Sequence, residues 1–258
     1  MLNGLSHTDY GLIGYPLGHS LSKAFFTQIF AADHSGRSYD NFELKELTPE
    51  ALYNLVLLNP MLKGFNVTAP YKEAILEYLD KVSDTARRAD AVNTVKINRA
   101  ADGRVLGLEG YNTDVDGFRG SLEDFLEGYR PTGALVLGTG GAAKAVCVAL
   151  DLLGIEHKMV SRTKKGDGII GYADIDADTV ASHPLIINAT PAGTYRACDT
   201  CPPFPYQLLG ELNYCHDLVY NPEETQFMKL SAERGAHVKN GMDMLCGQAL
   251  KSLQIWNS

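Results

Sequence analysis

The chain has 258 residues, of which 45% are hydrophobic and 21% charged, as in a globular protein with one large domain or two of ordinary size. Its net charge of −8 argues against nucleic acid or an anionic membrane surface as the main partner. No apolar run reaches the roughly 18 residues of a membrane span, and the N-terminus lacks the basic start and apolar core of a signal peptide. We therefore expect a cytoplasmic protein, a monomer or homodimer, without a nucleic-acid or membrane partner.

The first half of the chain predicts strands that alternate with helices. Strands are expected at 11–14, 62–68, 91–97 and 104–108, the last two forming a hairpin around the turn at 101–103. Helices are expected at 21–30, 47–58, 70–79 and 115–126. This alternation predicts an α/β fold.

Polar residues stand where several of these strands end. Ser20 and Ser22 lie at the mouth of a predicted helix, where they are either N-caps or ligands for a carboxylate or hydroxyl group. Lys72 falls in the first turn of the helix expected to start at Pro70, where the helix dipole disfavours a cation. A solvated lysine is the ordinary interpretation. Because a strand end with polar side chains precedes it, an acid–base role is the alternative.

Two further motifs carry polar groups into apolar surroundings. Asn93 and Thr94 interrupt an apolar strand, so they are either satisfied internally or exposed to a cleft. Asp114 is either a cap of the helix at 115–126 or a carboxylate that faces the cleft. The stretch around Asp114 lacks the spacing of a calcium loop, and the pair Cys198 and Cys201 lacks a second pair with zinc-ligand spacing. We therefore expect no metal site.

The second half opens with a glycine-rich turn between a strand at 134–137 and a helix that runs to 153. Gly138, Gly140 and Ala143 fit the pattern G-x-G-x-x-A of a dinucleotide-binding βαβ unit. Gly138 allows a sharp turn, and Gly140 removes a Cβ that would hold a pyrophosphate away from the backbone N–H groups. The alternative is a tight turn that needs glycine only for its backbone angles, but a second strand at 158–161 follows at the spacing a βαβ unit requires.

The end of that second strand favours NADP over NAD. NAD sites usually carry Asp or Glu there, whereas this chain has Ser161, Arg162, Thr163 and Lys165, which suit a 2′-phosphate. Further strands are expected at 185–190, where the end meets the cofactor cleft, and at 217–222. A last helix at 243–256 carries Gln248 and is expected to pack back onto the first domain.

The motifs together resemble the shikimate dehydrogenase family from about Gly11 to Trp256. They occur in the family's order: Gly-His-Ser-Leu-Ser at 18–22, Asn-Val-Thr-Ala-Pro-Tyr-Lys at 66–72, Ala-Val-Asn-Thr at 91–94, Asn-Thr-Asp at 112–114, the glycine turn, Ser-Arg-Thr at 161–163, Asn-Ala-Thr-Pro at 188–191, Asp-Leu-Val-Tyr-Asn-Pro at 217–222 and the closing motif at 241–249. Among the departures, Asp90 stands where the family usually has glycine.

The resemblance implies two α/β domains. Residues 1–113 with 241–258 would bind substrate, and residues 114–240 would form a Rossmann domain with a doubly wound parallel sheet that binds NADP. Lys72 and Asp114 would be the catalytic pair at the reacting oxygen. Implied substrate ligands are Ser20, Ser22, Thr68, Asn93, Tyr220 and Gln248. Implied cofactor contacts are Asp84, Gly138, Thr139, Gly140, Gly141, Ala142, Ser161, Arg162, Thr163, Lys165, Thr190, Leu218 and Gly241.

The implied activity is the reversible, NADPH-dependent reduction of 3-dehydroshikimate to shikimate in chorismate and aromatic amino acid biosynthesis. Three alternatives stay open: a broader NAD(P)-dependent quinate/shikimate dehydrogenase, a module that senses the dinucleotide without turnover, and a methylene-folate-type dehydrogenase. Retention of both Lys72 and Asp114 argues against the sensor, and the serine pair with the closing glutamine motif argues against the folate enzyme.

Overall fold

The computed structural model describes residues 8–18, 20–163, 166, 168–195 and 197–258. The chain forms two compact units, which we call unit 1 (Met1–Thr113 with Ala249–Ser258) and unit 2 (Asp114–Gln248). The first division falls between 113 and 114, the boundary expected from the sequence. The second falls between 248 and 249, eight residues after the expected one, because the start of the last helix packs within unit 2. There a Cβ on Gly117 would lie only 2.6 Å from Met244 O and 2.7 Å from Gln248 N.

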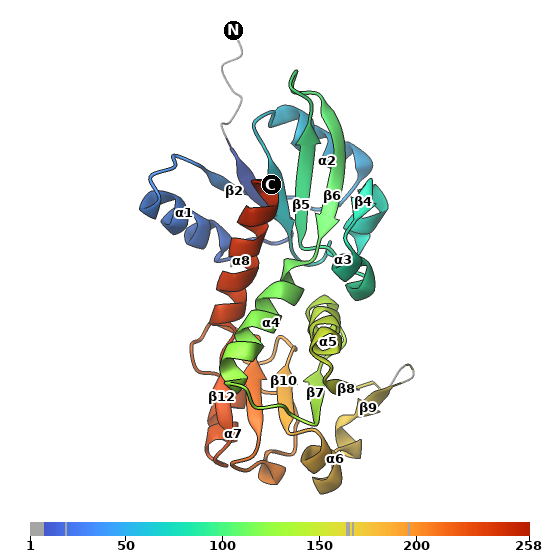
Figure 1. Cartoon of the computed structure of the whole chain (residues 1–258), viewed down its shortest axis with the longest axis vertical. Coiled ribbons are helices and arrows are strands. Elements are labelled where there is room, and N and C mark those ends of the chain that lie inside the picture. The colour runs from blue at the N-terminus through green and yellow to red at the C-terminus, as the bar shows by residue number, and fades with distance from the viewer. Residues whose placement is uncertain (1–7, 19, 164–165, 167, 196) are drawn as a thin grey trace. The chain divides into compact units, whose positions relative to one another are not determined.

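Unit 1 contains a six-stranded mixed sheet in the order β2-β1-β3-β5-β6-β4 (Figure 1). Its strands are β1 (Tyr10–Gly14), β2 (Tyr39–Glu43), β3 (Gly64–Val67), β4 (Lys81–Val82), β5 (Thr94–Arg99) and β6 (Val105–Tyr111). Strand β1 runs parallel to β2 and β3, whereas β5 runs antiparallel to β3 and β6. The predicted hairpin is thus present, and the ends of β1, β3 and β6 meet the beginning of β5 at one edge of the sheet.

The helices of unit 1 begin at side-chain caps in two cases. The helices are α1 (Ser22–Ala32), α2 (Pro49–Leu58), α3 (Asp84–Ala89) and the 3₁₀ helix η1 (Ala74–Tyr78). Thr48 caps α2 by accepting from Ala51 N at 3.1 Å, and Ser83 caps α3 by accepting from Ala86 N at 3.3 Å. Helix α3 ends at Asp90, whose φ of 48° and ψ of 38° lie in the left-handed region that favours glycine. The departure from the family pattern therefore places an aspartate at a glycine-type helix end.

The end of the last helix, α8 (Met242–Trp256), completes the core of unit 1. The Trp256 ring stacks on the Tyr10 ring at 4.7 Å between centroids, and its Nε1 donates to Val95 O at 2.9 Å. A Cβ on Gly64 would come within 2.3 Å of the Trp256 ring, so this strand needs glycine for the helix to approach. The C-terminal turns of α8 thus pack onto the first domain, as the sequence predicts.

Unit 2 contains a six-stranded parallel sheet in the order β12-β11-β10-β7-β8-β9. Its strands are β7 (Gly133–Leu137), β8 (Glu156–Ser161), β9 (Ile169–Gly171), β10 (Leu185–Asn188), β11 (Tyr214–Asp217) and β12 (His237–Lys239). Its main helices are α4 (Thr113–Leu126), α5 (Gly141–Leu153), α6 (Ala177–Ser182) and α7 (Gln226–Ala232). The strand order reverses at β7, which is the doubly wound Rossmann arrangement (Figure 1).

One predicted strand of unit 2 is displaced along the chain. The sequence favours a strand at 217–222, but β11 ends at Asp217, and the following apolar residues form a loop. The buried partner of β10 is Tyr214–Asp217, whose register pairs Asn188 with Asp217.

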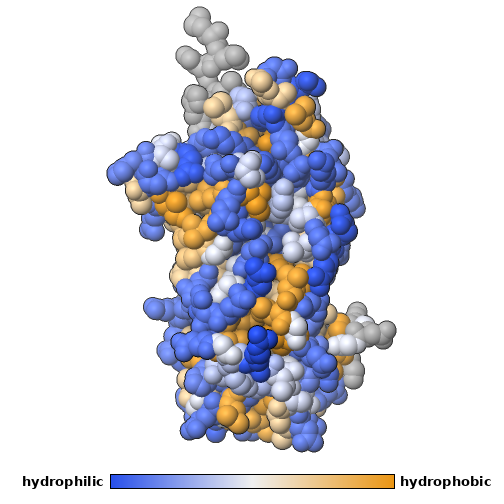
Figure 2. Space-filling view, viewed as in Figure 1, coloured by the Kyte–Doolittle hydropathy of each residue, from blue (hydrophilic) through white to orange (hydrophobic). Residues whose placement is uncertain are grey.

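Hydrophilic residues cover most of the surface shown in Figure 2, in keeping with the acidic composition.

Candidate functional site

The predicted site residues of unit 1 gather at the edge where β1, β3 and β6 end and β5 begins. Thr68 follows β3 directly, and its N–H donates to Ile13 O at 2.9 Å. Lys72 follows in the same loop, where its carbonyl accepts from Val92 N at 2.7 Å. Asn93 precedes β5, and its carbonyl accepts from Val67 N at 2.8 Å. Backbone hydrogen bonds therefore fix the Thr68–Lys72 loop against the Asn93 segment.

The helix expected to start at Pro70 is not formed as predicted. Lys72 is partly buried and lies in a turn, and only Ala74–Tyr78 is helical, as the short 3₁₀ helix η1. The peptide bond Ala69–Pro70 is cis. Lys72 therefore does not lie in the first turn of a helix, and the prediction that a helix dipole disfavours its charge is wrong. Its assignment as an acid–base residue rests on the family resemblance and on its place at this edge.

Behind the edge lies a buried group of neutral side chains, which we call the amide–hydroxyl cluster. Its members are Tyr39, Asn66, Asn93, Thr94, Thr113 and Ser252. Asn66 is central: its Oδ1 accepts from the Tyr39 hydroxyl at 2.9 Å. Its Nδ2 lies 3.0 Å from Thr94 Oγ1 and 3.1 Å from Ser252 Oγ. The neutral side chains of this cluster therefore join β2, β3 and β5 to the last helix.

Two predicted substrate ligands connect to this cluster. The Ser22 side chain lies near the Tyr39 hydroxyl: burial raises the pKa of this hydroxyl well above its ordinary value, and the nearby serine opposes the rise. Asn93 is 3% exposed, and its Oδ1 accepts from Thr113 N at 2.7 Å while its Nδ2 donates to Thr113 Oγ1 at 3.0 Å. Asn93 thus has the internal partners that the first of the two interpretations requires. Ser20 Oγ accepts from Ser22 N at 3.2 Å, but the N-cap of α1 is Leu21 and no side chain caps it, so neither serine is the N-cap that the sequence allowed.

The predicted cofactor residues of unit 2 converge on a cavity of about 640 Å³ at the carboxyl ends of β7, β8 and β10. Six of them line it: Gly138, Thr139, Gly140, Ser161, Arg162 and Thr190. This is the crevice in which open α/β sheets bind their ligands. Sequence reasoning missed Tyr172, which also lines the cavity and is within electrostatic reach of Arg162.

The glycine turn has the geometry that a dinucleotide requires. Gly138 has a φ of +118°, and a Cβ there would lie 3.0 Å from Ala189 O, so both backbone and space demand glycine. A Cβ on Gly140 would meet no atom within 4 Å, so the space beside it is open. No side chain caps α5, which begins at Gly141 and Ala142. An anion can therefore approach the backbone at the start of α5.

The remaining cofactor candidates lie elsewhere or outside the described residues. Thr163 donates its N–H to Ser161 Oγ at 3.3 Å, and Lys165 lies outside the residues that the structure describes. Leu218 and Gly241 are neighbours, because a Cβ on Gly241 would lie 2.1 Å from Leu218 O. Asp84 belongs to unit 1, at the exposed start of α3, 3.9 Å from Arg87.

Three further candidates belong to unit 2. Asp114 is 8% exposed and lies in the first turn of α4, where the dipole favours a carboxylate. It is therefore not the N-cap that the sequence allowed as one alternative. Burial raises the pKa of Tyr220, in the loop after β11. Gln248 Nε2 donates to Leu245 O at 3.1 Å, on its own helix.

A buried carboxylate that the sequence did not single out as a site residue lies beside this cavity. Asp217 ends β11 with no exposed surface, and burial raises its pKa to about 6. It accepts from Thr225 Oγ1 at 2.6 Å, Asn188 Nδ2 at 2.9 Å and Val219 N at 2.9 Å. Its only signal in the sequence is its place at the start of the Asp-Leu-Val-Tyr-Asn-Pro motif.

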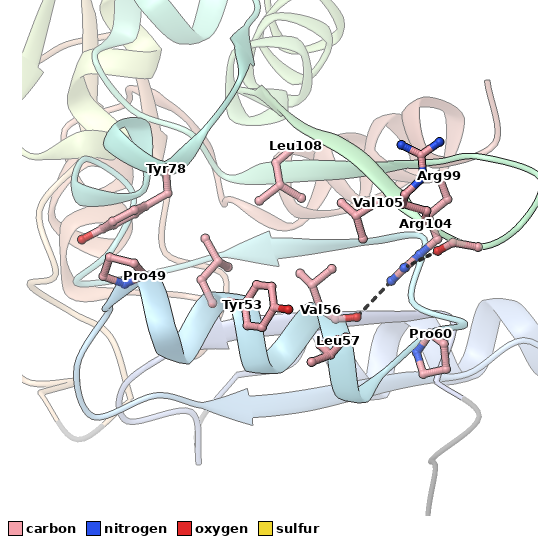
Figure 3. Close-up of a pocket in the computed structure, with 12 residues that line it drawn as sticks. Pro49, Tyr53, Val56, Leu57, Pro60, Tyr78, Arg99, Arg104, Val105 and Leu108 are labelled. Carbon is pink, nitrogen blue, oxygen red and sulfur yellow. Dashed lines mark hydrogen bonds between the residues drawn. The ribbon is translucent and has the colours of Figure 1, made fainter.

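A second cavity, of about 600 Å³, lies in unit 1 between α2 and the β5–β6 hairpin (Figure 3). None of the predicted site residues lines it. The Arg99 guanidinium closes one end by donating to Val56 O at 3.0 Å and Asn59 O at 3.3 Å, as Figure 3 shows for Val56. Arg99 therefore caps the last turn of α2, and this cap accounts for its position without a ligand.

Among the described residues, no group of three or more His, Cys, Asp and Glu side chains is placed to hold a metal ion. No helix in the described part of the chain is long and apolar enough to cross a membrane. Cys198 and Cys201 are free thiols, and only Cys201 lines the unit 2 cavity.

The sequence of the chain is similar to those of proteins of one known family. A family model for the shikimate dehydrogenase substrate binding domain matches residues 12–95. A shikimate dehydrogenase (NADP(+)) from Clostridium beijerinckii is 38% identical over 254 residues, which are 96% of this chain and 91% of that protein.

Solved structures of other proteins match this chain over 96% of its length. Shikimate 5-dehydrogenase from Thermus thermophilus, in complex with NADP(H) and shikimate, is 33% identical with a TM-score of 0.78, covering 96% of this chain and 93% of that one. Quinate dehydrogenase from Corynebacterium glutamicum, in complex with NAD, is 26% identical with a TM-score of 0.84 over the same shares. The chain belongs to the shikimate dehydrogenase family.

Proposed function

We propose that this chain catalyses the reversible reduction of 3-dehydroshikimate to shikimate with NADPH, in aromatic amino acid biosynthesis. The observation that carries the proposal is similarity over 96% of the chain to a protein named as an NADP-dependent shikimate dehydrogenase. The cavity of unit 2 supports the cofactor half of the proposal independently. The free thiols of all five cysteines are in keeping with a cytoplasmic enzyme, which acts as a monomer or homodimer.

The residues of unit 2 fit NADP. The open space beside Gly140 and the uncapped start of α5 receive the pyrophosphate. Arg162, exposed at the cavity, pairs with the 2′-phosphate, and Ser161 and Thr163 add hydroxyl groups beside it. When bound, the reduced nicotinamide supplies the hydride.

We assign the proton transfer to Lys72 and Asp114. In the reduction, negative charge grows on the carbonyl oxygen of the substrate, and the Lys72 ammonium stabilises and protonates that oxygen. In the reverse direction the neutral amine accepts the alcohol proton. Asp114 is its acid–base partner, which orients the lysine and the hydroxyl group. Help of this kind is worth roughly 10²- to 10⁴-fold in rate.

The substrate itself is held by hydrogen-bonding side chains. We propose that Ser20 and Ser22 bind its carboxylate, and that Thr68, Asn93, Tyr220 and Gln248 hold the hydroxyl groups and the ring. Ser22 lies near the Tyr39 hydroxyl at the buried amide–hydroxyl cluster. The Asn93 amide is held in place by its hydrogen bonds to Thr113.

A quinate/shikimate dehydrogenase that uses NAD is the second candidate. The observation that favours it is the TM-score of 0.84 with a quinate dehydrogenase in complex with NAD. Arg162 argues against it, because NAD lacks the phosphate that an arginine would pair with.

Initial rates with two substrates and two cofactors decide between these functions. We expect fast NADPH oxidation with 3-dehydroshikimate and slow reaction with NADH or with 3-dehydroquinate. Comparable rates with NADH or 3-dehydroquinate would move the protein to the broader class. Binding of NADPH without turnover of either substrate would leave a dinucleotide-sensing module.

A further inference from the structure

The Asp217 carboxylate joins three segments around the carboxyl edge of the unit 2 sheet. Its partners are Asn188 at the end of β10, the Val219 N–H in the loop after β11, and Thr225, which caps α7 by accepting from Met228 N at 3.3 Å. The side chains of Asp217, Asn188 and Thr225 are fully buried. A buried carboxylate is stable only if hydrogen bonds replace its water, and here three donors do so.

Asn188 connects Asp217 to residues that line the cavity. Its Nδ2 faces Asp217, which leaves its Oδ1 to accept from Thr190 Oγ1 at 2.6 Å and Thr190 N at 3.1 Å. The same Nδ2 lies 3.3 Å from Ala192 O. Thr190 and Ala192 both line the cavity. The orientation of the Asn188 amide therefore decides where the Thr190–Ala192 turn lies.

Thr190 has little freedom in this position. A Cβ on Gly138 would lie 3.4 Å from Thr190 Cγ2, so the threonine side chain already stands against the glycine turn. The Leu218 N–H also donates to Asn188 O at 2.9 Å, which ties the loop after β11 to the same strand end. A rotation of the Asn188 amide would thus displace the wall on which the cofactor rests.

We propose that Asp217 is a positioning residue for the cofactor: its carboxylate holds the Asn188 amide, and through it Thr190, in the orientation that shapes the dinucleotide cavity. Asp217 acts only through these side chains and does not itself line the cavity. The inference rests on the proposed function in so far as it takes NADPH to occupy the cavity.

The protonation state of Asp217 gives the inference a second consequence. Protonation replaces one acceptor with a donor, so the three-donor arrangement fails as the pH falls through about 6, the pKa to which burial raises this carboxyl. Three titratable side chains nearby, those of His216, Cys215 and Tyr206, do not change their protonation in this pH range. Burial lowers the pKa of His216 to about 3, raises that of Cys215 to about 12 and raises that of Tyr206 further. The Cys201 side chain lies near Tyr206 and lines the cavity.

The test is the dissociation constant of NADPH, measured by cofactor fluorescence without substrate, for wild type and Asp217→Asn between pH 5 and 8. Asparagine keeps the shape but loses one acceptor. We expect Asp217→Asn to raise the dissociation constant at pH 7.5 roughly threefold to tenfold, the range for one weakened hydrogen bond. The 2′-phosphate of NADPH titrates near pH 6 in every variant, so only the difference between the two pH profiles is read.

Two matched variants separate positioning from general damage. Asp176→Asn changes an exposed carboxylate that caps α6 through Thr179 and does not line the cavity, so NADPH affinity should stay as in wild type. Thr225→Val removes the hydroxyl that donates to Asp217 at 2.6 Å, and Thr225 does not line the cavity. Because this donor lowers the pKa of Asp217, the midpoint of the pH profile of NADPH binding should move upward in Thr225→Val. Thr225→Ser should restore the wild-type midpoint.

The outcomes are distinguishable from a failure of the proposed function. Because the assay follows binding alone, it gives an answer even if no dehydroshikimate turnover is found. A folded Asp217→Asn protein that binds NADPH with wild-type affinity and an unchanged pH profile would overturn the proposal. If Asp217→Asn does not fold, an unshifted midpoint in Thr225→Val would overturn it instead.

Discussion

Both units bury polar side chains at the edge of their sheet that carries the candidate site, but they use different chemistry. In unit 1 the amide–hydroxyl cluster is neutral, and Asn66 shares its hydrogen bonds among Tyr39, Thr94 and Ser252. In unit 2 a single carboxylate, Asp217, collects three donors. A neutral network holds its geometry over a wide pH range, whereas a network built on one buried acid changes when that acid titrates.

This difference matches the ligands that we propose for the two units. In unit 1 the cluster backs side chains that would bind a small hydroxylated acid and supply a proton. In unit 2 the network shapes the wall of a cavity for a large dinucleotide. Four predictions break or sharpen the comparison.

The largest expected effect is on the chemistry assigned to unit 1. Lys72→Ala should lower kcat by roughly 10²- to 10⁴-fold with little change in KM, because it removes the proton donor but few binding contacts. Steady-state kinetics with NADPH and 3-dehydroshikimate measure both parameters. Lys81→Ala, at a lysine with 77% of its side chain exposed, is the control and should leave kcat unchanged. A near-wild-type kcat for Lys72→Ala would remove Lys72 from the chemistry.

The second prediction concerns the pH dependence of stability. The pKa of Asp217 is raised from 3.8 to about 6 in the folded chain, so the folded state holds the proton more tightly than the unfolded state. This stabilisation is fully present below pH 3.8 and is lost as the pH rises through about 6. The loss is about 3 kcal/mol, from about two pKa units at 1.36 kcal/mol each.

Denaturant unfolding of wild type and Asp217→Asn at pH 4.5 to 7.5 checks this prediction. The free energy of unfolding of wild type should fall with pH relative to the variant, which lacks the titrating group. A difference between the two proteins that is constant across this range would show that Asp217 does not titrate there.

The third prediction tests the neutral cluster of unit 1. Asn66→Leu should lower the free energy of unfolding by about 2–3 kcal/mol, because the Tyr39 hydroxyl and its neighbours lose partners they cannot replace with water. Unlike the effect at Asp217, this loss should be the same from pH 5 to 8.

The matched control is Asn41→Leu, at an exposed asparagine on β2, with an expected change within about 0.5 kcal/mol. Equal effects at both asparagines would contradict a special role for the cluster.

The smallest expected effect concerns cofactor choice in unit 2. Arg162→Ala should raise KM for NADPH roughly tenfold to a hundredfold, the range for a lost charge-assisted hydrogen bond, and should leave KM for NADH unchanged. Lys158→Ala, at an exposed cation on β8, the strand that precedes Arg162, should change neither value. If Arg162→Ala weakened NADPH and NADH equally, Arg162 would not recognise the 2′-phosphate.

The local features of both units could be predicted from the sequence. The glycine turn is an example, because the G-x-G-x-x-A spacing itself demands the positive φ seen at Gly138. The alternation of strands and helices predicted the α/β class, whereas the doubly wound order of unit 2 was implied by the family resemblance and is confirmed. The hairpin of β5 and β6 followed from the Asp102-Gly103 turn.

What the sequence could not give depends on contacts far apart in the chain. Asn66 and Ser252 are 186 residues apart, so no local pattern reveals that they share a hydrogen bond. The strand predicted at 217–222 is a loop because burial against β10 selects 214–217 instead. The helix predicted from Pro70 fails because the loop carrying Lys72 is held by Val92 N, a partner outside the local sequence.

The proposal that Lys72 transfers the proton and Arg162 recognises the cofactor is tested most directly by the NADPH dissociation constant of Lys72→Ala, measured beside that of Arg162→Ala. Our account predicts that Lys72→Ala binds NADPH as tightly as wild type although it has lost turnover, whereas Arg162→Ala binds it weakly. If Lys72→Ala weakened NADPH binding as much as Arg162→Ala does, the separation of proton transfer at Lys72 from cofactor recognition at Arg162 would be contradicted.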